Sequence, residues 1–424
     1  MATATDRSTP YARPAAPHEA VSNEELLRRA RELRPLVEEQ AAETERLTHI
    51  SEDLHRRFED AGFYRMLMPK RYGGSETDLP TYVQVWMEIA RGDMSAAWCG
   101  CLAANHSLQL GSWWPERTQD EIFGGTRGLY KAASVAAPLS GFARRVEGGW
   151  ELNGKVSYCS GIPYSTHYIG QTFPEPVQKG GPPGPPLLFV APRSAFTILN
   201  DWGELTGLVG SGSNSIVFDK AFVPQHYVIE NTHMADVECT GGTIGSRLHG
   251  NAMYATRGIG FFTMTVGGIM VGAARGAADE FEKILKSRKT IRAPFGPWAE
   301  NSDYQRWFGM AITKLKIAEI AVIEAAKMQM ELGRATVEEG RPYTFGDDQL
   351  VGAVARDAYS DAWQAFQNWI FRYAGSSAGR RGQKIERVLR DMAIGWSHFN
   401  TAQNDWGYIE VAKSRLGLPP GSLF

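Results

Sequence analysis

Two histidines in apolar segments are the side chains of this sequence best suited to acid–base chemistry. His398 lies in DMAIGWSHFN and His106 lies in CLAANHSLQLGSWW. An imidazole titrates near pH ~6.5, so either ring can accept or donate a proton under neutral conditions. The alternative for both is a core histidine hydrogen-bonded to a carbonyl group, and this is the interpretation we retain for His167 and His249.

Hydroxyl, thiol and guanidinium groups near glycines could hold a polar ligand. Ser134 occurs in KAASVAAP, and Cys159 and Ser160 end the β-rich run KVSYCSGI. Serine beside glycine is also ordinary turn chemistry. Arg257, in NAMYATRGIGFF, stands among apolar and small residues. A buried guanidinium needs a partner, which is either a bound ligand or an acidic side chain.

Composition and charge exclude several classes of partner. The chain has 424 residues, 43% of them hydrophobic, and a formal net charge of −2. This balance gives no electrostatic reason to expect nucleic acid or an anionic membrane as partner. A small, roughly neutral organic substrate suits it better. The four cysteines form no CxxC pair, so we expect reduced thiols and neither a metal site nor a disulfide framework.

The sequence also lacks the signals that target a protein to a membrane. We find no run of about 18 apolar residues, and the first segment, MATATDRSTPYARPAAPHEA, lacks the apolar core of a signal peptide. We therefore expect a cytoplasmic protein with no membrane association.

Hydrophobic periodicity divides the chain into an arm and three further parts. Residues 1–20 are rich in Ala, Pro and Thr and predict a flexible arm. Residues 21–128 have helical period, and residues 129–240 contain short β-rich runs separated by Gly and Pro turns. Residues 241–424 return to long amphipathic helices. We therefore expect a mainly α fold, with an N-terminal helical domain, a central β barrel or sandwich, and a C-terminal helical bundle.

This order, together with five local motifs, resembles the acyl-CoA dehydrogenase superfamily. The motifs are AGFYRMLMPKRYGG, GGWELNGKVSYCSG, GLVGSGSNSIVFDKAFVP, KSRKT and ERVLRDM, and they follow one another in the superfamily's order. Each motif is weak alone, but five in sequence over nearly the whole chain after residue 45 are specific. The resemblance implies an acyl-CoA dehydrogenase-like fold that ends in a four-helix bundle.

The resemblance also implies a flavin between the β domain and the bundle. By position it assigns the Ser160 hydroxyl and Cys159 backbone to the flavin N5 and O4 edge, and Ser134 to the pyrimidine side. Arg257 would lie beside the flavin or its phosphate, and Arg288 would reach the flavin of a neighbouring subunit. The sequence departs from the family at this last position, because KTIRAPFG carries an insertion before Phe-Gly.

A second departure concerns the base of the dehydrogenases. Those enzymes use a Glu shortly after the "RD" to remove a proton from an acyl thioester, but no acid lies here between Asp391 and Asp405. His398 stands in that stretch instead. This substitution, and the histidine in CLAANHSLQLGSWW, resemble the two-component flavin-dependent monooxygenases, such as the oxygenase component of 4-hydroxyphenylacetate hydroxylase.

That branch implies an oxygenase component that receives reduced flavin, FMNH2 or FADH2, from a separate NAD(P)H flavin reductase. With O2 as co-substrate, the flavin forms a C4a-hydroperoxide that hydroxylates an aromatic, phenolic small molecule. His398 would accept the phenolic proton, and His106 would orient the substrate or the peroxide. Neither FMN nor FAD is selected, because no GxGxxG fingerprint is present. The resemblance further implies a homotetramer.

Three alternatives remain open at this point. The same chemistry could oxygenate nitrogen or sulfur, an acyl-CoA dehydrogenase could carry a displaced base, or the protein could be a scaffold that acts through protein contacts. In the segment GNAMYATRGIGFFTMTVGG, where some dehydrogenases place their Glu, there is no acid either.

Overall fold

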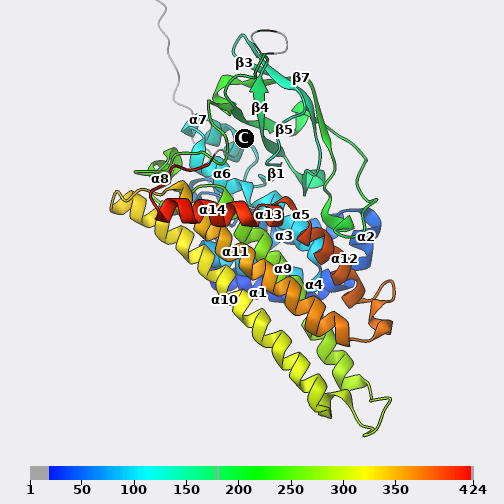
Figure 1. Cartoon of the computed structure of the whole chain (residues 1–424). Coiled ribbons are helices and arrows are strands. Elements are labelled where there is room, and N and C mark those ends of the chain that lie inside the picture. Colours follow the sequence, from blue (N-terminus) through cyan, green and yellow to red (C-terminus); the bar gives the residue numbers. More distant parts are fainter. Residues whose placement is uncertain (1–18, 177, 179–180, 422–424) are drawn as a thin grey trace, which may run out of the picture.

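The structure is a computed structural model that describes residues 19–176, 178 and 181–421. Helices form the first and last parts of the chain, and strands form the part between them. Figure 1 shows the sheet at one end of the molecule and the long helices α9, α10 and α11 running away from it. The arm expected over residues 1–20 lies almost wholly outside the described residues.

The N-terminal helices begin where polar side chains cap them. Ser22 accepts from Glu25 N at 3.2 Å at the start of α1, and Asp93 accepts from Ala96 N at 2.8 Å at the start of α5. These caps satisfy amide groups that have no partner inside the helix. The helices are α1 (Asn23–Glu39), α2 (Ala41–Leu47), α3 (Glu52–Asp60), α4 (Leu79–Gly92), α5 (Met94–Ala104), α6 (His106–Trp113) and α7 (Glu116–Gln119).

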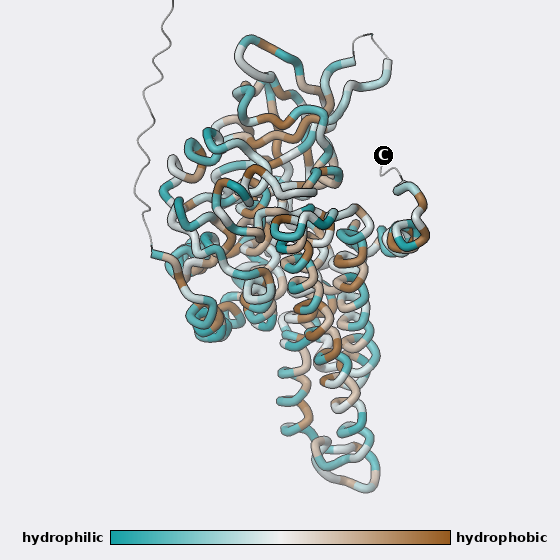
Figure 2. The backbone as a smooth tube through the Cα atoms, turned by 90° about the vertical axis from the view of Figure 1, so that its left-hand side faces the viewer, coloured by the Kyte–Doolittle hydropathy of each residue, from teal (hydrophilic) through white to brown (hydrophobic). Residues whose placement is uncertain are grey.

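Eight strands form one sheet in the order β6-β7-β3-β2-β4-β5-β8, with β1 parallel to β4. Alternate residues of β4 and β5 pack into two different hydrophobic clusters. Tyr168 and Phe189 belong to the cluster within the β domain, whereas Ile169 and Leu188 belong to the cluster that contains Trp113 of α6. Figure 2 shows hydrophobic segments gathered inside this part. The strands are β1 (Ala132–Ser134), β2 (Phe142–Val146), β3 (Gly149–Val156), β4 (His167–Pro174), β5 (Leu187–Pro192), β6 (Thr197–Ile198), β7 (Ile216–Pro224) and β8 (Val228–Glu230).

The C-terminal bundle is built around α9, which packs against α4, α10, α11 and α12. Small residues permit this close approach, since a Cβ at Gly272 would lie 2.2 Å from Met87 O and one at Gly276 would lie 2.3 Å from Arg91 O. The helices of this part are α8 (Ile244–His249), α9 (Ile259–Ser287), α10 (Ser302–Glu338), α11 (Phe345–Ala365), α12 (Lys384–Trp396), α13 (Phe399–Ala402) and α14 (Asn404–Arg415).

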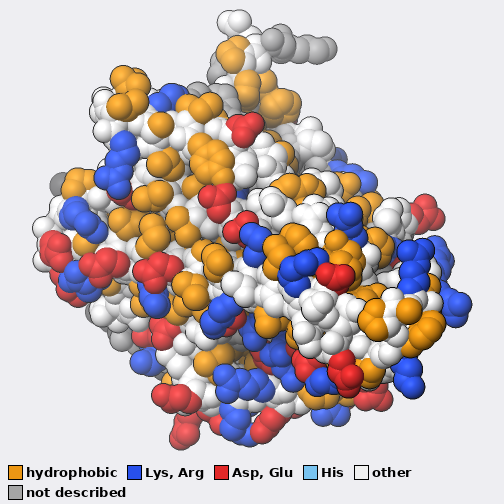
Figure 3. Space-filling view, turned by 60° about the horizontal axis from the view of Figure 1, so that its bottom comes forward, with side chains coloured by type: hydrophobic (Ala, Val, Ile, Leu, Met, Phe, Trp, Pro, Cys, Tyr) orange, Lys and Arg blue, Asp and Glu red, His pale blue; other side chains and the backbone are white. Residues whose placement is uncertain are grey.

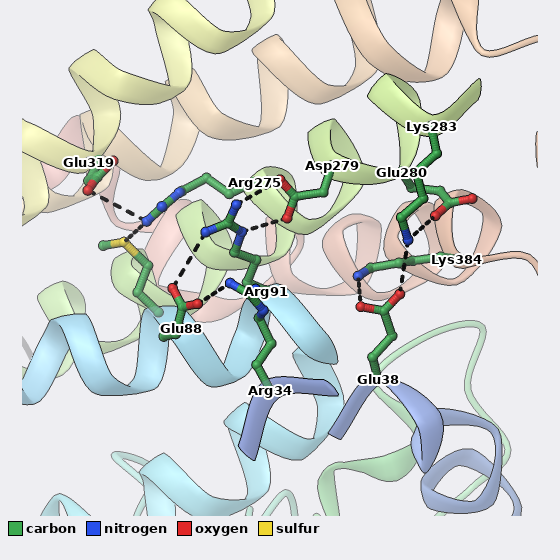
Figure 4. Close-up of polar contacts among 11 residues, drawn as sticks. Arg34, Glu38, Glu88, Arg91, Arg275, Asp279, Glu280, Lys283, Glu319 and Lys384 are labelled. Atoms are coloured by element: carbon green, nitrogen blue, oxygen red, sulfur yellow. Dashed lines mark hydrogen bonds and ion pairs between the residues drawn. The ribbon is translucent and has the colours of Figure 1, made fainter. Parts of the chain in front are cut away.

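Ion pairs tie the N-terminal helices to the bundle (Figure 4). Arg91 of α4 binds Asp279 of α9 through Nε at 2.5 Å, and Lys384 of α12 binds Glu38 of α1 at 2.7 Å. These partners are far apart in sequence. The first pair joins α4 to α9, and the second pair fixes α12 against α1.

Among the described residues, α9 alone is long and apolar enough to cross a membrane by length and composition. An 18-residue window has a mean hydropathy of 1.2, but 83% of that window is buried inside the protein, the environment of a core helix. The four cysteines are free and buried. In the part of the chain that the structure describes, no group of His, Cys, Asp or Glu residues could hold a metal ion.

Candidate active site

His398 occupies the turn between α12 and α13. Its Nδ1 accepts a hydrogen bond from Asn400 N at 3.3 Å and so caps α13. The imidazole meets the ring of Trp98 edge-on, with ring centroids 5.3 Å apart and an interplanar angle of 73°. Burial lowers the pKa of His398 to about 4, so the ring is neutral at neutral pH. Because Nδ1 acts as an acceptor, the proton of the neutral ring is on Nε2.

Trp98 connects His398 to the sheet. Its Nε1 donates to Ser160 Oγ at 3.1 Å, and Ser160 Oγ lies 2.8 Å from Ser213 Oγ, which in turn lies 2.8 Å from Ser211 Oγ. The result is a chain of three hydroxyls that begins at an indole N–H and is nearly closed to solvent. Such a chain can hold the Ser160 hydroxyl in one orientation.

Local backbone conformation brings Ser160 to α5. Gly161 has φ +74°, and a Cβ at this position would lie 2.5 Å from Cys99 O. Only glycine permits both this conformation and this approach. The Cys159 amide already donates to Asn214 O at 3.2 Å, and its side chain is completely buried. The Ser160 hydroxyl is therefore better placed than the Cys159 backbone N–H to bind a ligand.

His106 and Ser134 meet at strand β1. His106 is 2% exposed, and its Nδ1 donates to Ala132 O at 2.5 Å, which fixes the proton on Nδ1. Burial lowers the pKa of His106 to about 4, so this ring is also neutral. Ser134 lies two residues beyond Ala132, and its Oγ is buried with no hydrogen-bond partner. A buried hydroxyl without a partner is costly and fits a group that a ligand completes.

Trp98, which contacts His398, lies in α5, and His106 begins the next helix, α6. His106 follows Trp98 by eight positions, about two helical turns. Between them, Leu102 is partly exposed although nearly all of its helix is buried, and Phe262 is likewise partly exposed at the start of α9. The Phe262 ring lies 5.4 Å from the His106 ring. Leu102 and Phe262 are thus the apolar side chains beside Trp98 and His106 that are not fully buried.

Arg257 lies at the start of α9 and is 6% exposed. Its Nη2 donates to Ala235 O at 3.2 Å, its guanidinium lies 5.8 Å above the Phe345 ring, and its Nε is buried with no partner. The charge of Arg257 opposes the effect of burial on Asp348, whose pKa is nevertheless raised. Arg257 therefore has an acid nearby and one donor still available.

Arg288 lies elsewhere. It follows the last residue of α9, at the end of the bundle away from the sheet (Figure 1). Its Nη1 donates to Ala374 O at 2.8 Å, and its guanidinium lies 5.3 Å above the Trp298 ring. Within this chain Arg288 is therefore not brought to Ser160 or His398.

Asp391 anchors the helix that carries His398. Its Oδ1 accepts from Leu208 N at 2.6 Å, and its Oδ2 accepts from the Ser95 hydroxyl at 3.2 Å. It thus joins α12 to α5 and to the loop before β7. Burial and the neighbouring carboxyl group of Asp93 raise the pKa of Asp391. The acid preceding His398 in the sequence is therefore occupied in positioning the helix.

The fold brings predicted site residues together in two pairs and adds others. His398 and Ser160 meet at Trp98, His106 and Ser134 meet at β1, and Arg288 is separate. Sequence analysis missed Ser211 and Ser213, which lie in SGSNS before β7. A cluster of small hydroxyl residues at the start of a strand was the available signal.

Comparisons with known proteins identify the family of the chain. A model of the acyl-CoA dehydrogenase N-terminal domain matches residues 22–112, and a model of the acyl-CoA dehydrogenase C-terminal domain matches residues 264–403. The chain is 27% identical over 395 residues to HsaA, the oxygenase subunit of a flavin-dependent monooxygenase from Rhodococcus jostii (strain RHA1), with 91% of this chain and 97% of that protein covered.

A second relative is the oxygenase component of an FADH(2)-dependent resorcinol hydroxylase from Rhizobium sp. (strain MTP-10005). It is 25% identical over 364 residues, which cover 85% of this chain and 86% of that protein. The crystal structure of the HsaA monooxygenase from M. tuberculosis superposes with a TM-score of 0.83 at 23% identity and covers 95% of this chain and 99% of that one. At this identity the superposition shows a shared fold.

Proposed function

The chain belongs to the acyl-CoA dehydrogenase superfamily, and we propose that it is the oxygenase component of a two-component flavin-dependent monooxygenase that hydroxylates an aromatic small molecule. The fold expected from the sequence is confirmed, as is the resemblance to the monooxygenase branch. Relatives are named as oxygenase subunits or components, which supports a separate reductase as partner.

One observation carries the proposal: an imidazole stands in the stretch of sequence where the superfamily's dehydrogenases need a carboxylate. His398 contacts Trp98, and Trp98 donates to Ser160. A dehydrogenase needs a base that removes a proton from a carbon acid. No acid lies between Asp391 and Asp405, and Asp391 is bound to Leu208 and Ser95. This arrangement disfavours dehydrogenation.

The residues present fit a flavin. Ser134 Oγ and Arg257 Nε are buried without partners, and Ser160 presents a hydroxyl already oriented by Trp98. Flavin carries acceptors and donors along its pyrimidine and N5 edge, which match these groups. The reduced cofactor, FMNH2 or FADH2, supplies the electrons with which O2 is activated for transfer of one oxygen atom. The apolar side chains of α5 and α9 keep water away from the site.

We propose that His398 acts on the phenolic hydroxyl of the substrate, either by accepting its proton or by donating a hydrogen bond to it. A phenol has a pKa near ~10, and withdrawing its proton raises the electron density of the ring carbon that attacks the transferred oxygen atom. The neutral ring of His398 offers Nε2 to the substrate, because Nδ1 is bound by Asn400 N. If His398 acts as the base, Nε2 needs a free lone pair. The ring proton must then move from Nε2 to Nδ1, and this breaks the hydrogen bond from Asn400 N. Otherwise it assists by donating from Nε2–H.

His106 has a positioning role in this proposal. Its Nδ1–H bond to Ala132 O fixes β1, the strand that carries Ser134. The imidazole also lies against Phe262, which is partly exposed at the start of α9. His106 therefore sets the distance between Ser134 and the substrate side of the site.

We also propose a homotetramer in the cytoplasm. Several apolar side chains on α10 and α14 are exposed in the single chain, among them Ile317 at 54% and Ile320 at 56%. Figure 3, which looks toward the lower side of the molecule, shows apolar side chains reaching the surface between charged ones. Burial of these side chains between copies would stabilise an assembly. Light scattering should give the mass of four chains, and a monomer would contradict this proposal.

The deciding experiment mixes the protein anaerobically with reduced FMN or reduced FAD and then adds O2. We expect a transient absorbance band in the near ultraviolet, distinct from oxidised flavin, that lasts longer than in flavin alone. Oxidised flavin that forms at the rate of the protein-free reaction would refute the oxygenase assignment. A dehydrogenase would instead reduce artificial acceptors with an acyl-CoA and retain oxidised FAD through purification.

A further inference from the structure

Arg356 is a buried cation without a partner. It lies in the middle of α11 and is 0% exposed. Its Nε, Nη1 and Nη2 are inaccessible to solvent and make no hydrogen bond, and no carboxylate of residues 19–176, 178 and 181–421 forms an ion pair with it. A buried charge left unpaired costs several kcal/mol.

Two further polar side chains at the same helix contact also lack partners. Gln349 lies two turns before Arg356 on α11, is 0% exposed, and has no hydrogen-bond partner at either amide atom. Asn404 begins α14 and has a buried Oδ1 without a partner. Helix α14 lies across α11 (Figure 1). Unpartnered donors and acceptors are therefore concentrated where these two helices meet.

Two glycines let the helix backbone pack closely against the guanidinium. A Cβ at Gly407 of α14 would lie 2.1 Å from Arg356 Nη2 and 3.5 Å from Gln349 Oε1. A Cβ at Gly352 of α11 would lie 3.3 Å from Arg356 Nη1. Any larger residue at Gly407 would collide with the guanidinium, so the sequence keeps both sides of this cation free of side chains.

The nearest acids are engaged elsewhere. Asp348 and Asp357 attract the Arg356 charge from a distance. The Asp348 carboxylate accepts from Ile259 N and Gly260 N at 3.1 and 3.0 Å, and Asp357 accepts from the Tyr408 hydroxyl. Neither acid is free to close on the guanidinium. The partner that the site lacks is an oxyanion, for which a planar guanidinium offers two parallel N–H donors.

The location favours the substrate as the source of this oxyanion. One turn beyond Arg356, Tyr359 has a buried hydroxyl without a partner, and its ring lies 5.9 Å from the ring of Trp396. Trp396 precedes His398 by two residues. The site therefore continues the His398 side of the proposed reaction centre, whereas the groups assigned to flavin, Ser134 and Ser160, come from the sheet.

We propose that Arg356, assisted by Gln349, binds the carboxylate of the substrate, so that the aromatic substrate is an acid. This inference rests on the proposed function and replaces the neutral substrate suggested by the net charge. It also explains how α14 is held. In the free protein α14 packs over an unpaired cation, and in the complex it packs over a neutralised pair. Binding of an acid should therefore stabilise α14 and the turn that carries His398.

The test compares acids with their neutral esters. The probes are 4-hydroxybenzoate, 4-hydroxyphenylacetate and 3-(4-hydroxyphenyl)propanoate, each beside its methyl ester, titrated without flavin and followed by tryptophan fluorescence and thermal shift. In the wild-type protein we expect at least one acid to bind about tenfold or more tightly than its ester, the size of a charged hydrogen-bonded contact. In Arg356→Met that ratio should fall to about one.

Two variants make the result specific. Arg341→Met removes an exposed cation of the same charge and should keep the wild-type ratio of acid to ester. Gln349→Leu should lower the ratio severalfold while leaving the charge in place. Arg356→Met should also unfold at a higher temperature than the wild-type protein in the absence of ligand, because an unpaired buried charge has been removed. Equal binding of every acid and ester by the wild-type protein overturns the proposal.

The phosphate of the flavin is the other oxyanion that Arg356 could bind, and a titration with flavin tests this alternative. Reduced FMN and reduced riboflavin are titrated anaerobically against wild type and Arg356→Met. Unchanged FMN affinity supports the substrate assignment, and a loss for FMN without a loss for riboflavin overturns it in favour of the flavin phosphate. The oxygen reaction of reduced flavin with the wild-type protein is recorded separately, so failure of the acid preference and failure of the oxygenase function give different results.

Discussion

Trp98 of α5 and Ser160, which lies in the loop that follows β3, are joined by a hydrogen bond of 3.1 Å from the indole Nε1 to the hydroxyl Oγ. The same indole also contacts His398, whose ring centroid is 5.3 Å away. One side chain therefore links the group assigned to the flavin edge with the group assigned to the substrate.

Trp98→Phe should weaken the binding of reduced flavin while preserving the packing against His398. The phenyl ring keeps apolar contact but cannot donate, so Ser160 retains only Ser213 to orient it. We expect the dissociation constant of reduced flavin to rise about two- to tenfold, the worth of one neutral hydrogen bond. Anaerobic fluorescence titration measures it. Trp307→Phe, at a Trp that stacks on Tyr373 in the bundle, is the matched control and should leave this dissociation constant unchanged.

Substitutions of His398 should distinguish a proton acceptor from a hydrogen-bond donor. Asparagine can replace Nδ1 as the cap of Asn400 N, and glutamine can replace Nε2–H as donor to the substrate. If His398 is a base, Ala, Asn and Gln should all slow product formation about 10²-fold or more and leave the transient flavin band nearly intact. Near-wild-type product formation by His398→Gln would refute the base and establish the donor. Stopped-flow absorbance and product analysis supply both readouts.

His106→Asn should reduce the loss of stability in acid. The pKa of His106 is about 4 in the folded protein and near ~6.5 when unfolded, so the unfolded chain binds a proton that the folded chain does not. Stability is therefore lost as pH falls from ~6.5 to ~4, by up to about 3 kcal/mol for this residue. The amide of asparagine can still donate to Ala132 O but does not titrate. Urea unfolding at pH 7 and pH 5 should show a smaller difference in the variant, and an equal difference would contradict the neutral state of His106.

Asp391→Asn should stabilise the protein increasingly as pH rises. Burial and Asp93 raise the pKa of Asp391, so the folded state binds its proton more tightly than the unfolded state. Stability is complete below the unfolded pKa near ~4 and is lost as pH rises through the raised value. The amide keeps an oxygen for Leu208 N and carries no charge. Scanning calorimetry at pH 5 and pH 8 should give the larger gain at pH 8. A lower melting temperature at both values would show that the carboxylate is ionised and favourable in the fold.

Much of the fold could be predicted because it depends on local patterns. Helical periodicity and alternation in strands give the order of helices, sheet and bundle, and the capped start of α1 at Ser22 follows from residues close in sequence. The assignment of α9 is the instructive case. Its apolar composition alone would also suit a membrane, and only its contacts with α4, α10 and α11 show that it is the centre of the bundle.

The sequence by itself determined which chemical groups the protein has: an imidazole at position 398 without a nearby carboxylate, and hydroxyls at Ser134 and Ser160. The tertiary structure decided what those groups are bound to. The Nδ1 of His398 is occupied by a helix cap, the Nδ1 of His106 is held by a strand carbonyl, and Arg356 has no partner among the described residues. Hydrogen bonds and charge pairs join residues that packing brings together from distant parts of the chain, so no local pattern can specify whether a side chain is already satisfied or still available to a ligand.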